Sequence, residues 1–153
     1  MMKLASEVIR TLAGKTLATA ESCTGGGIGA ALTAVPGSSA VYKGGIISYC
    51  NEVKHDLLGV SLDSLEKFGA VSSPVAEEMA RGAREKLHTD AAVSVTGLAG
   101  PGGDEFGNPV GTVFIGYADE SKVIARHFLF SGDREAIRHR ATEEALKLIL
   151  ENA

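Results

Sequence analysis

The hydrophobic and polar positions switch along the chain between helical and strand-like spacing. Leu4, Val8 and Leu12 recur at intervals of four, which predicts an amphipathic helix over 2–13. A second clear helix is expected over 73–87, where Pro74 stands near the first position. Glycine and proline boundaries predict further helices over 25–34, 52–58, 61–67 and 131–150. Short apolar runs predict strands over 16–20, 45–50, 91–95, 111–117 and 122–130.

The order of these elements indicates the fold class. Strands and helices alternate in the first part, and an antiparallel hairpin and a long helix follow. This order predicts an α/β protein, a three-layer α/β/α sandwich on a mixed, mostly parallel sheet of about five strands. A length of 153 residues fits a single domain, 1–153.

Composition narrows the function classes. The net charge of -4 argues against a general nucleic-acid or membrane surface, although a local basic pocket for an anionic small molecule remains compatible with it. Two cysteines make no disulfide framework, so free thiols in a reducing compartment are expected. No signal sequence appears, and no apolar run approaches the ~20 residues of a membrane span. A cytoplasmic location is therefore expected.

The stretch 17–27 combines a strand, a tight turn and a helix start. Its apolar run ends at Glu21, Ser22 and Thr24 follow, and three glycines come next. This order places Ser22 near unpaired backbone N–H groups, which stabilise an anion or a developing oxyanion. The alternative is that Ser22 and Thr24 merely cap the helix.

Two further strand ends carry distinctive residues, at 48–54 and 96–103. Ligands collect outside the carboxyl ends of parallel strands, so these ends and the Ser22 turn are expected to meet at one rim. Ser22 and Lys54 would then form a nucleophile–base pair, provided that burial or a nearby cation lowers the lysine pKa. A solvated surface lysine is the alternative. Glu21 could orient Lys54 or accept N–H bonds of the turn.

The loop after the third strand is rich in glycine. Residues 96–103 offer several backbone N–H groups and little side-chain bulk, as loops that bind phosphates or oxyanions do. A long surface loop is the alternative. It is not a Walker A sequence, and residues 25–30 fit G-x-G-x-x-A only formally, because four polar residues separate the strand from the first glycine.

The last predicted helix carries two arginines on its apolar face. Arg134 and Arg138 share that face with Ala141, Ala145 and Leu148. Arginines in such a position meet either a buried carboxylate or an anionic ligand, and the sequence leaves both open. Other candidates are weaker: Tyr49 could line a ring-binding pocket or belong to the core. The four histidines show no metal-ligand spacing, so no metal is expected.

Five strings, in this order, resemble the CinA C-terminal domain family, the nicotinamide-nucleotide amidases. They are AESCTGG (20–26), YCNEVK (49–54), GAVS (69–72), TGLAGP (96–101) and GDREAIR (132–138). The resemblance covers nearly the whole chain and is closest to the form without a second, molybdopterin-binding-like domain. The sequence departs at Thr96 and Cys50, where the family often has serine.

The resemblance implies a three-layer α/β/α fold and hydrolysis of nicotinamide mononucleotide (NMN) to nicotinic acid mononucleotide and ammonia, in pyridine-nucleotide recycling. It implies Ser22 and Lys54 as the catalytic pair and neither cofactor nor metal. The expected oxyanion and substrate-binding groups are Thr24, Gly25, Tyr49, Thr96, Gly97, Gly100, Arg134 and Arg138. A homo-oligomer is compatible with this interpretation. A non-catalytic nucleotide-binding or regulatory module, and an amidase for a different amide, remain as alternatives.

Overall fold

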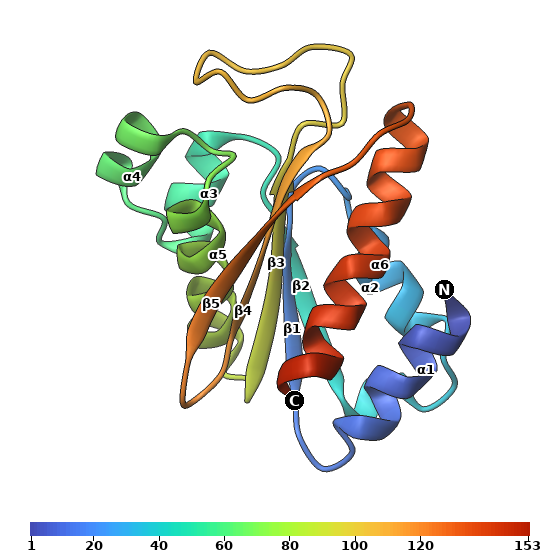
Figure 1. Ribbon diagram of the computed structural model, residues 1–153. Helices are drawn as coiled ribbons and strands as arrows, with labels where there is room; N and C mark the ends of the chain where they lie inside the picture. Colours follow the sequence, from blue (N-terminus) through green and yellow to red (C-terminus); the bar gives the residue numbers. More distant parts are fainter.

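A five-stranded sheet separates two helical layers in the computed structural model, which describes all of residues 1–153 (Figure 1). The strands are β1 (Leu17–Glu21), β2 (Tyr42–Ile47), β3 (Ala91–Gly97), β4 (Thr112–Ala118) and β5 (Val123–Leu129). The helices are α1 (Met2–Thr11), α2 (Gly27–Thr33), α3 (Asn51–Leu58), α4 (Leu62–Phe68), α5 (Ser73–Leu87) and α6 (Arg134–Asn152), with one 3-10 turn, η1 (Ser38–Ala40).

The strands lie in the order β2-β1-β3-β4-β5. β1 pairs in parallel with both β2 and β3, whereas β4 pairs antiparallel with β3 and β5. Four strands therefore run in one direction and β4 alone runs in the other, which confirms the predicted mixed, mostly parallel α/β/α sandwich. The carboxyl ends of β1, β2 and β3 lie at the same rim, and the loop between β3 and β4 rises above that rim (Figure 1).

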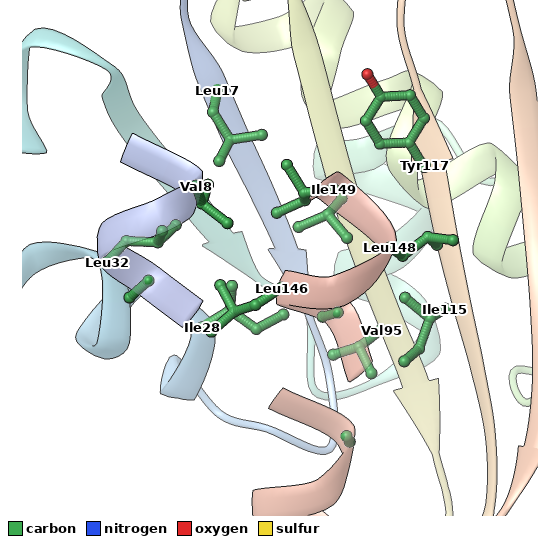
Figure 2. Packing of buried hydrophobic residues seen from close by; sticks show 14 of the residues in the cluster. Val8, Leu17, Ile28, Leu32, Val95, Ile115, Tyr117, Leu146, Leu148 and Ile149 are labelled. Carbon is green, nitrogen blue, oxygen red and sulfur yellow. The ribbon is translucent and has the colours of Figure 1, made fainter. Parts of the chain in front are cut away.

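The larger core lies between the sheet and the layer formed by α1, α2 and α6. Figure 2 shows Leu17, Val95 and Ile115 of the sheet facing Ile28 of α2 and Ile149 of α6. All five side chains are fully buried. Burying an aliphatic side chain of this size stabilises the fold by roughly 1.5–3 kcal/mol, so this face holds the two layers together.

The opposite face of the sheet is lined by small residues and is covered by α3, α4 and α5. Ala18, Ala20 and Ala92 take part in this second core. A Cβ atom at Gly116 would lie 2.4 Å from the carbonyl oxygen of Ala76 in α5. The helix backbone can approach the sheet this closely because the strand side chains beneath it are small.

Two strands differ from their predicted bounds by more than one residue. β2 begins at Tyr42, three residues before the prediction, and ends at Ile47. Its start lacks an apolar run, and its length is fixed by parallel pairing with β1 rather than by its own pattern. β3 continues through Thr96 and Gly97, because both residues pair with β4. The glycine-rich loop therefore begins at Leu98.

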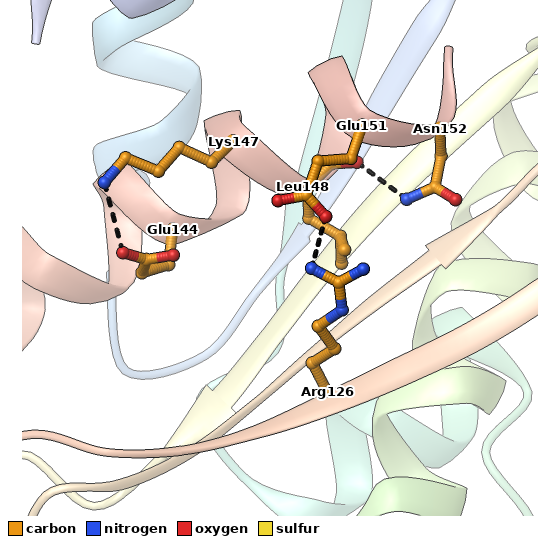
Figure 3. Close-up of polar contacts among 6 residues, drawn as sticks. All are labelled: Arg126, Glu144, Lys147, Leu148, Glu151 and Asn152. Atoms are coloured by element: carbon orange, nitrogen blue, oxygen red, sulfur yellow. Dashed lines mark hydrogen bonds and ion pairs between the residues drawn. The ribbon is translucent and has the colours of Figure 1, made fainter.

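Exposed ion pairs lie on the surface of α6, among them one to β5 and one within the helix. Figure 3 shows Arg126 of β5 paired with Glu151, and Lys147 paired with Glu144 at 3.3 Å. Solvent-exposed pairs of this kind contribute about 0–1 kcal/mol each, so they add little to the two cores. No helix combines the length and the apolar composition that crossing a membrane requires.

Candidate active site

Ser22 lies in the turn between β1 and α2, and Glu21 holds that turn in place. The Glu21 carboxylate is buried and accepts hydrogen bonds from the Thr24 hydroxyl at 2.7 Å, the Ile28 N–H at 2.9 Å and the Gly29 N–H at 3.0 Å. Carboxylates at a helix N-terminus satisfy backbone donors that would otherwise have no partner. Of the two roles considered for Glu21, the structure shows that it accepts the N–H bonds of the turn.

The Lys54 side chain reaches Ser22 from the other side of the rim. Its amine donates to the Ser22 hydroxyl oxygen at 3.0 Å and to the Ser48 carbonyl oxygen at 2.6 Å. Lys54 lies in the first turn of α3 and is 2% exposed, so the alternative of a solvated surface lysine is wrong. Only residues 48–50 separate the end of β2 from the start of α3. The Lys54 side chain in the first turn of α3 therefore extends back towards β1.

Burial controls the protonation of this pair. It lowers the pKa of the Lys54 amine below its ordinary value, against the opposing effect of Cys50 and Cys23. Burial also raises the pKa of the adjacent Cys23 thiol to about 11, so this thiol is protonated at neutral pH. The Ser22 hydroxyl therefore has an amine of lowered pKa within hydrogen-bond reach, and the neighbouring thiol is not ionised.

The hydroxyl of Thr24 is directed elsewhere. It donates to the Glu21 carboxylate and is 1% exposed. Thr24 is not among the residues that line the cavity next to Ser22. Of the two hydroxyl groups considered as nucleophiles, only that of Ser22 has the Lys54 amine as its partner.

A cavity of about 270 Å³ opens beside the Ser22–Lys54 pair. Its walls come from the Ser22 turn, the segment 49–54, the residues that precede α5, the end of β3 with the glycine-rich loop, and the start of α6. The lining residues are Ser22, Cys23, Tyr49, Cys50, Asn51, Lys54, Ala70, Val71, Thr96, Gly97, Leu98, Ala99, Gly100, Gly102 and Arg134. Lys54 and Arg134 are the two basic residues among them and none of the lining residues is Asp or Glu, so the walls suit an anionic ligand.

Several backbone N–H groups of the cavity wall donate to no atom of another residue. Among them are the N–H of Cys23, next to Ser22, and those of Ala99, Gly100 and Gly102 in the glycine-rich loop. Unpaired N–H groups around a cavity are the donors that hold phosphate oxygens and oxyanions. The Gly25 N–H is not one of them, because it donates to the Ser22 carbonyl at 3.0 Å.

Arg134, in the first turn of α6, spans two walls of the cavity. Its guanidinium donates to the Tyr49 hydroxyl and to the Gly100 carbonyl, both at 2.7 Å. Tyr49 is 60% exposed, so it lies at the cavity mouth and not in the core. A guanidinium has five N–H donors, and the two bonds described here leave others for a ligand.

Arg138 lies one turn further along α6 and does not line the cavity. Its guanidinium donates to the carbonyl oxygens of Cys23 at 3.0 Å and of Thr24 at 3.1 Å. Both partners are backbone carbonyl groups, so the buried carboxylate, one of the two partners considered from the sequence, is wrong, and the anionic ligand stays a prediction. The two bonds anchor the backbone next to Ser22.

Thr96 and Gly97 line the cavity as the last residues of β3. The Thr96 hydroxyl donates to the Ala70 carbonyl at 2.8 Å. The N–H of the next residue, Leu98, donates to the Thr112 carbonyl at 2.9 Å. This strand end therefore forms the floor of the cavity and links it to the segment that precedes α5.

Sequence reasoning gave no role to several wall residues, among them Cys50, Ala70 and Val71. Ala70 and Val71 belong to a string on which the family resemblance was based, but no chemical argument singled them out. The helix predicted over 52–58 begins one residue earlier, at Asn51, and Cys50 occupies its N-cap position. No group of three or more His, Cys, Asp or Glu side chains is placed to hold a metal ion.

The fold and the site define a three-layer α/β/α domain with a buried serine–lysine pair at the carboxyl rim of its sheet. The model of the CinA C-terminal domain matches residues 1–153, and the chain belongs to this family. A CinA-like protein of Thermosynechococcus vestitus is 51% identical over 138 residues, which are 88% of this chain and 33% of the relative. The chain thus spans about a third of the length of the curated relatives that it matches.

Solved structures of the same superfamily share the fold. The competence-damaged protein (CinA) superfamily protein from Escherichia coli superposes with a TM-score of 0.97 at 36% identity, over 99% of this chain and 90% of that protein. The competence/damage inducible protein CihA from Agrobacterium tumefaciens gives a TM-score of 0.94 at 39% identity, over 98% and 93% of the two chains.

Proposed function

We propose that this domain hydrolyses the carboxamide of nicotinamide mononucleotide to a carboxylate and ammonia, with Ser22 as nucleophile and Lys54 as base. The observation that carries the proposal is the 3.0 Å contact between the buried Lys54 amine and the Ser22 hydroxyl at the wall of a cavity. Serine is a weak nucleophile unless an adjacent base accepts its proton. The resemblance to the nicotinamide-nucleotide amidases supplies the substrate.

In the proposed reaction, the neutral Lys54 amine takes the Ser22 proton while the serine oxygen bonds to the amide carbon. The Cys23 N–H, which adjoins Ser22, is a donor for the oxyanion. The Lys54 ammonium then protonates the departing nitrogen, which leaves as ammonia, and an acyl ester remains on Ser22. Water, deprotonated by Lys54, attacks the ester, and Ser22 regains its proton as the carboxylic acid product leaves.

The phosphate of the substrate is expected near Arg134. This guanidinium is the exposed cation of the cavity wall, and the adjacent loop supplies unpaired N–H groups. No acidic side chain lines the cavity, so nothing opposes an anionic substrate. These features favour a nucleotide amide over an uncharged amide of similar size.

The test is ammonia release from NMN by the purified chain and by two variants. We expect Ser22→Ala and Lys54→Met to lower kcat at least about 10³-fold, as loss of a nucleophile or of its base does. Exposed Lys43 gives the control, because Lys43→Met removes a lysine from β2 without touching the cavity. Circular dichroism checks that each variant is folded.

The outcome separates the alternatives. Full activity in both Ser22→Ala and Lys54→Met would overturn the mechanism. A rise in Tm with NMN but no ammonia would indicate a nucleotide-binding module instead. Ammonia release from other amides in a substrate panel, but not from NMN, would retain the mechanism and replace the substrate.

A further inference from the structure

The glycine-rich loop between β3 and β4 is tied to the segment that precedes α5 on the other side of the cavity. Both stretches contribute to the cavity wall. The loop contributes residues 98–100 and 102, and the segment contributes Ala70 and Val71. The two stretches are far apart in sequence, and Figure 1 shows the loop standing clear of the sheet. The separation of these walls therefore depends on side-chain contacts between loop and segment.

Asp104 organises the far end of the loop. Its carboxylate accepts hydrogen bonds from the Phe106 N–H at 3.0 Å, the Asn108 N–H at 2.9 Å and the Asn108 side-chain amide at 2.8 Å. Burial alone would raise the pKa of Asp104, but the hydrogen bonds from Asn108 and Phe106 lower it below its ordinary value. The carboxylate is charged at neutral pH, and charge-assisted bonds of this kind are the stronger ones.

Asn108 makes the connection across the cavity. Besides its bond to Asp104, its side-chain amide donates to the Val71 carbonyl at 3.2 Å. An asparagine amide has two hydrogens, and both are used here, one within the loop and one towards the segment. Asp104 thus fixes the orientation in which Asn108 reaches Val71.

A second contact lies beside this hydrogen bond. The Phe106 ring lies against Gly69, where a Cβ atom would come within 2.5 Å of the ring. Gly69 has a φ of +80°, which glycine adopts without strain. The absence of a side chain at Gly69 leaves the space that the ring needs, so loop and segment meet at two adjoining points.

We propose that Asp104 and Asn108 are positioning residues that fix the distance between these two walls and so set the affinity for the nucleotide. The inference rests on the proposed function for the identity of the ligand. Neither residue lines the cavity or touches the Ser22–Lys54 pair, so both act through Val71 and the loop backbone. Their loss weakens binding while the reacting pair stays in place.

The test compares three changes in the intact chain: Asp104→Ala, Asn108→Ala, and the exchange in which Asp104→Asn is combined with Asn108→Asp. The exchange keeps a side-chain pair within the loop but puts a carboxylate, which cannot donate, opposite the Val71 carbonyl. We expect all three to raise KM for NMN about tenfold, the effect of losing the hydrogen bond between the Asn108 side chain and the Val71 carbonyl, with kcat within about twofold.

Asp119 provides a matched control. Its carboxylate accepts bonds from the Ser121 N–H, the Ser121 hydroxyl and the Lys122 N–H in the β4–β5 turn and from the Tyr117 hydroxyl of β4, and it lines no part of this cavity. Asp119→Ala should lower stability by a similar amount and leave KM unchanged. An equal rise of KM in Asp119→Ala, or an unchanged KM in the exchanged pair, would overturn the proposal.

Two readouts separate this proposal from the proposed reaction. Calorimetry in the Ser22→Ala background measures Kd for NMN without turnover, and we expect the same tenfold loss of affinity. Hydrogen exchange should accelerate in 70–72 and 98–111 in the three variants only. If the parent chain binds NMN but releases no ammonia, the reaction fails and the Kd values decide the positioning role. If NMN does not bind, unchanged hydrogen exchange in the variants would refute the tether, and a loss of protection confined to 70–72 and 98–111 would support it.

Discussion

Arg138 shows how a charged side chain can serve a site that it does not enter. Its guanidinium bonds to the carbonyls of Cys23 and Thr24, and the peptide that joins these residues follows Ser22 directly. The same turn is held on its other side by Glu21. The position of the Ser22 hydroxyl relative to Lys54 therefore depends on two charges that contact only the turn.

Arg138→Met tests this role. We expect kcat for NMN to fall about tenfold to a hundredfold, because the serine loses its fixed approach to the amide carbon, and KM to change less than twofold. Arg140→Met is the control, since Arg140 lies on the same helix and its side chain stacks on the Phe130 ring instead. A large rise in KM at constant kcat would show that Arg138 binds substrate directly.

Helix α5 illustrates how a small residue sets the spacing of two elements. The Ser94 hydroxyl donates to the Ala76 carbonyl at 2.5 Å, and Gly116 lies beneath the same carbonyl. The helix lies close to β3 and β4 because both positions carry little bulk. Ala70 and Val71, which precede α5, are held in the cavity wall by the same docking.

Gly116→Ala should separate α5 from the sheet. The added methyl group would meet the Ala76 carbonyl and the Ser94 hydroxyl at 2.4 and 2.5 Å, so we expect the free energy of unfolding to fall by about 1–3 kcal/mol. Urea denaturation measures it. Gly102→Ala is the control, because no heavy atom lies within 4 Å of its Cβ position. Equal losses in both variants would contradict the close-packing argument.

At the scale of the whole molecule, the fold brings the side chains of the candidate site together at one rim of the sheet. Burying a lysine there lowers the stability of the folded state. Three parallel strands end at this rim, and α3 brings a lysine into it that is almost completely buried. A buried amine that has lost its hydration destabilises the folded state when it is charged. The base that the reaction needs is thus the group that burial penalises.

This penalty predicts that pH has opposite effects on the activity of the parent and on the stability gained by replacing Lys54. Because its pKa is lowered by burial, kcat/KM for NMN should rise with pH through that pKa as the amine becomes neutral. Lys54→Met should be inactive but more stable than the parent. Its stability gain should be largest below the lowered pKa and shrink as pH rises towards the ordinary lysine value, since the unfolded chain binds the extra proton over that range. Parallel denaturation series at several pH values measure the difference, and a gain independent of pH would refute it.

The elements with strong local patterns were predictable from sequence. The bounds of α5 follow from Pro74 and the apolar spacing, and the turn at Ser22 follows from its run of glycines. The start of β2 was not predictable from sequence, because Tyr42 and Lys43 pair with the sheet although they form no apolar run.

Contacts of the site between two side chains of complementary chemistry were predictable from sequence. Contacts between a side chain and the backbone were not. A serine and a lysine at neighbouring strand ends suggested a pair, and the fold brings them to 3.0 Å. The partners of Arg138, and the partner of Asn108 in the segment before α5, are backbone carbonyl groups, which every residue carries. Neither a pattern nor a residue type in the sequence specifies such contacts.

The serine and lysine of the proposed reaction lie on one continuous stretch, from β1 to α3, whereas Gly100, Gly102 and Arg134 of the cavity wall come from the second half of the chain. Under this proposal, the residues that break the bond and a large part of the wall that contacts the substrate belong to different portions of the polypeptide. Sequence changes in 98–111 and at the start of α6 would then alter which amide the domain accepts and leave the proposed bond-breaking residues as they are.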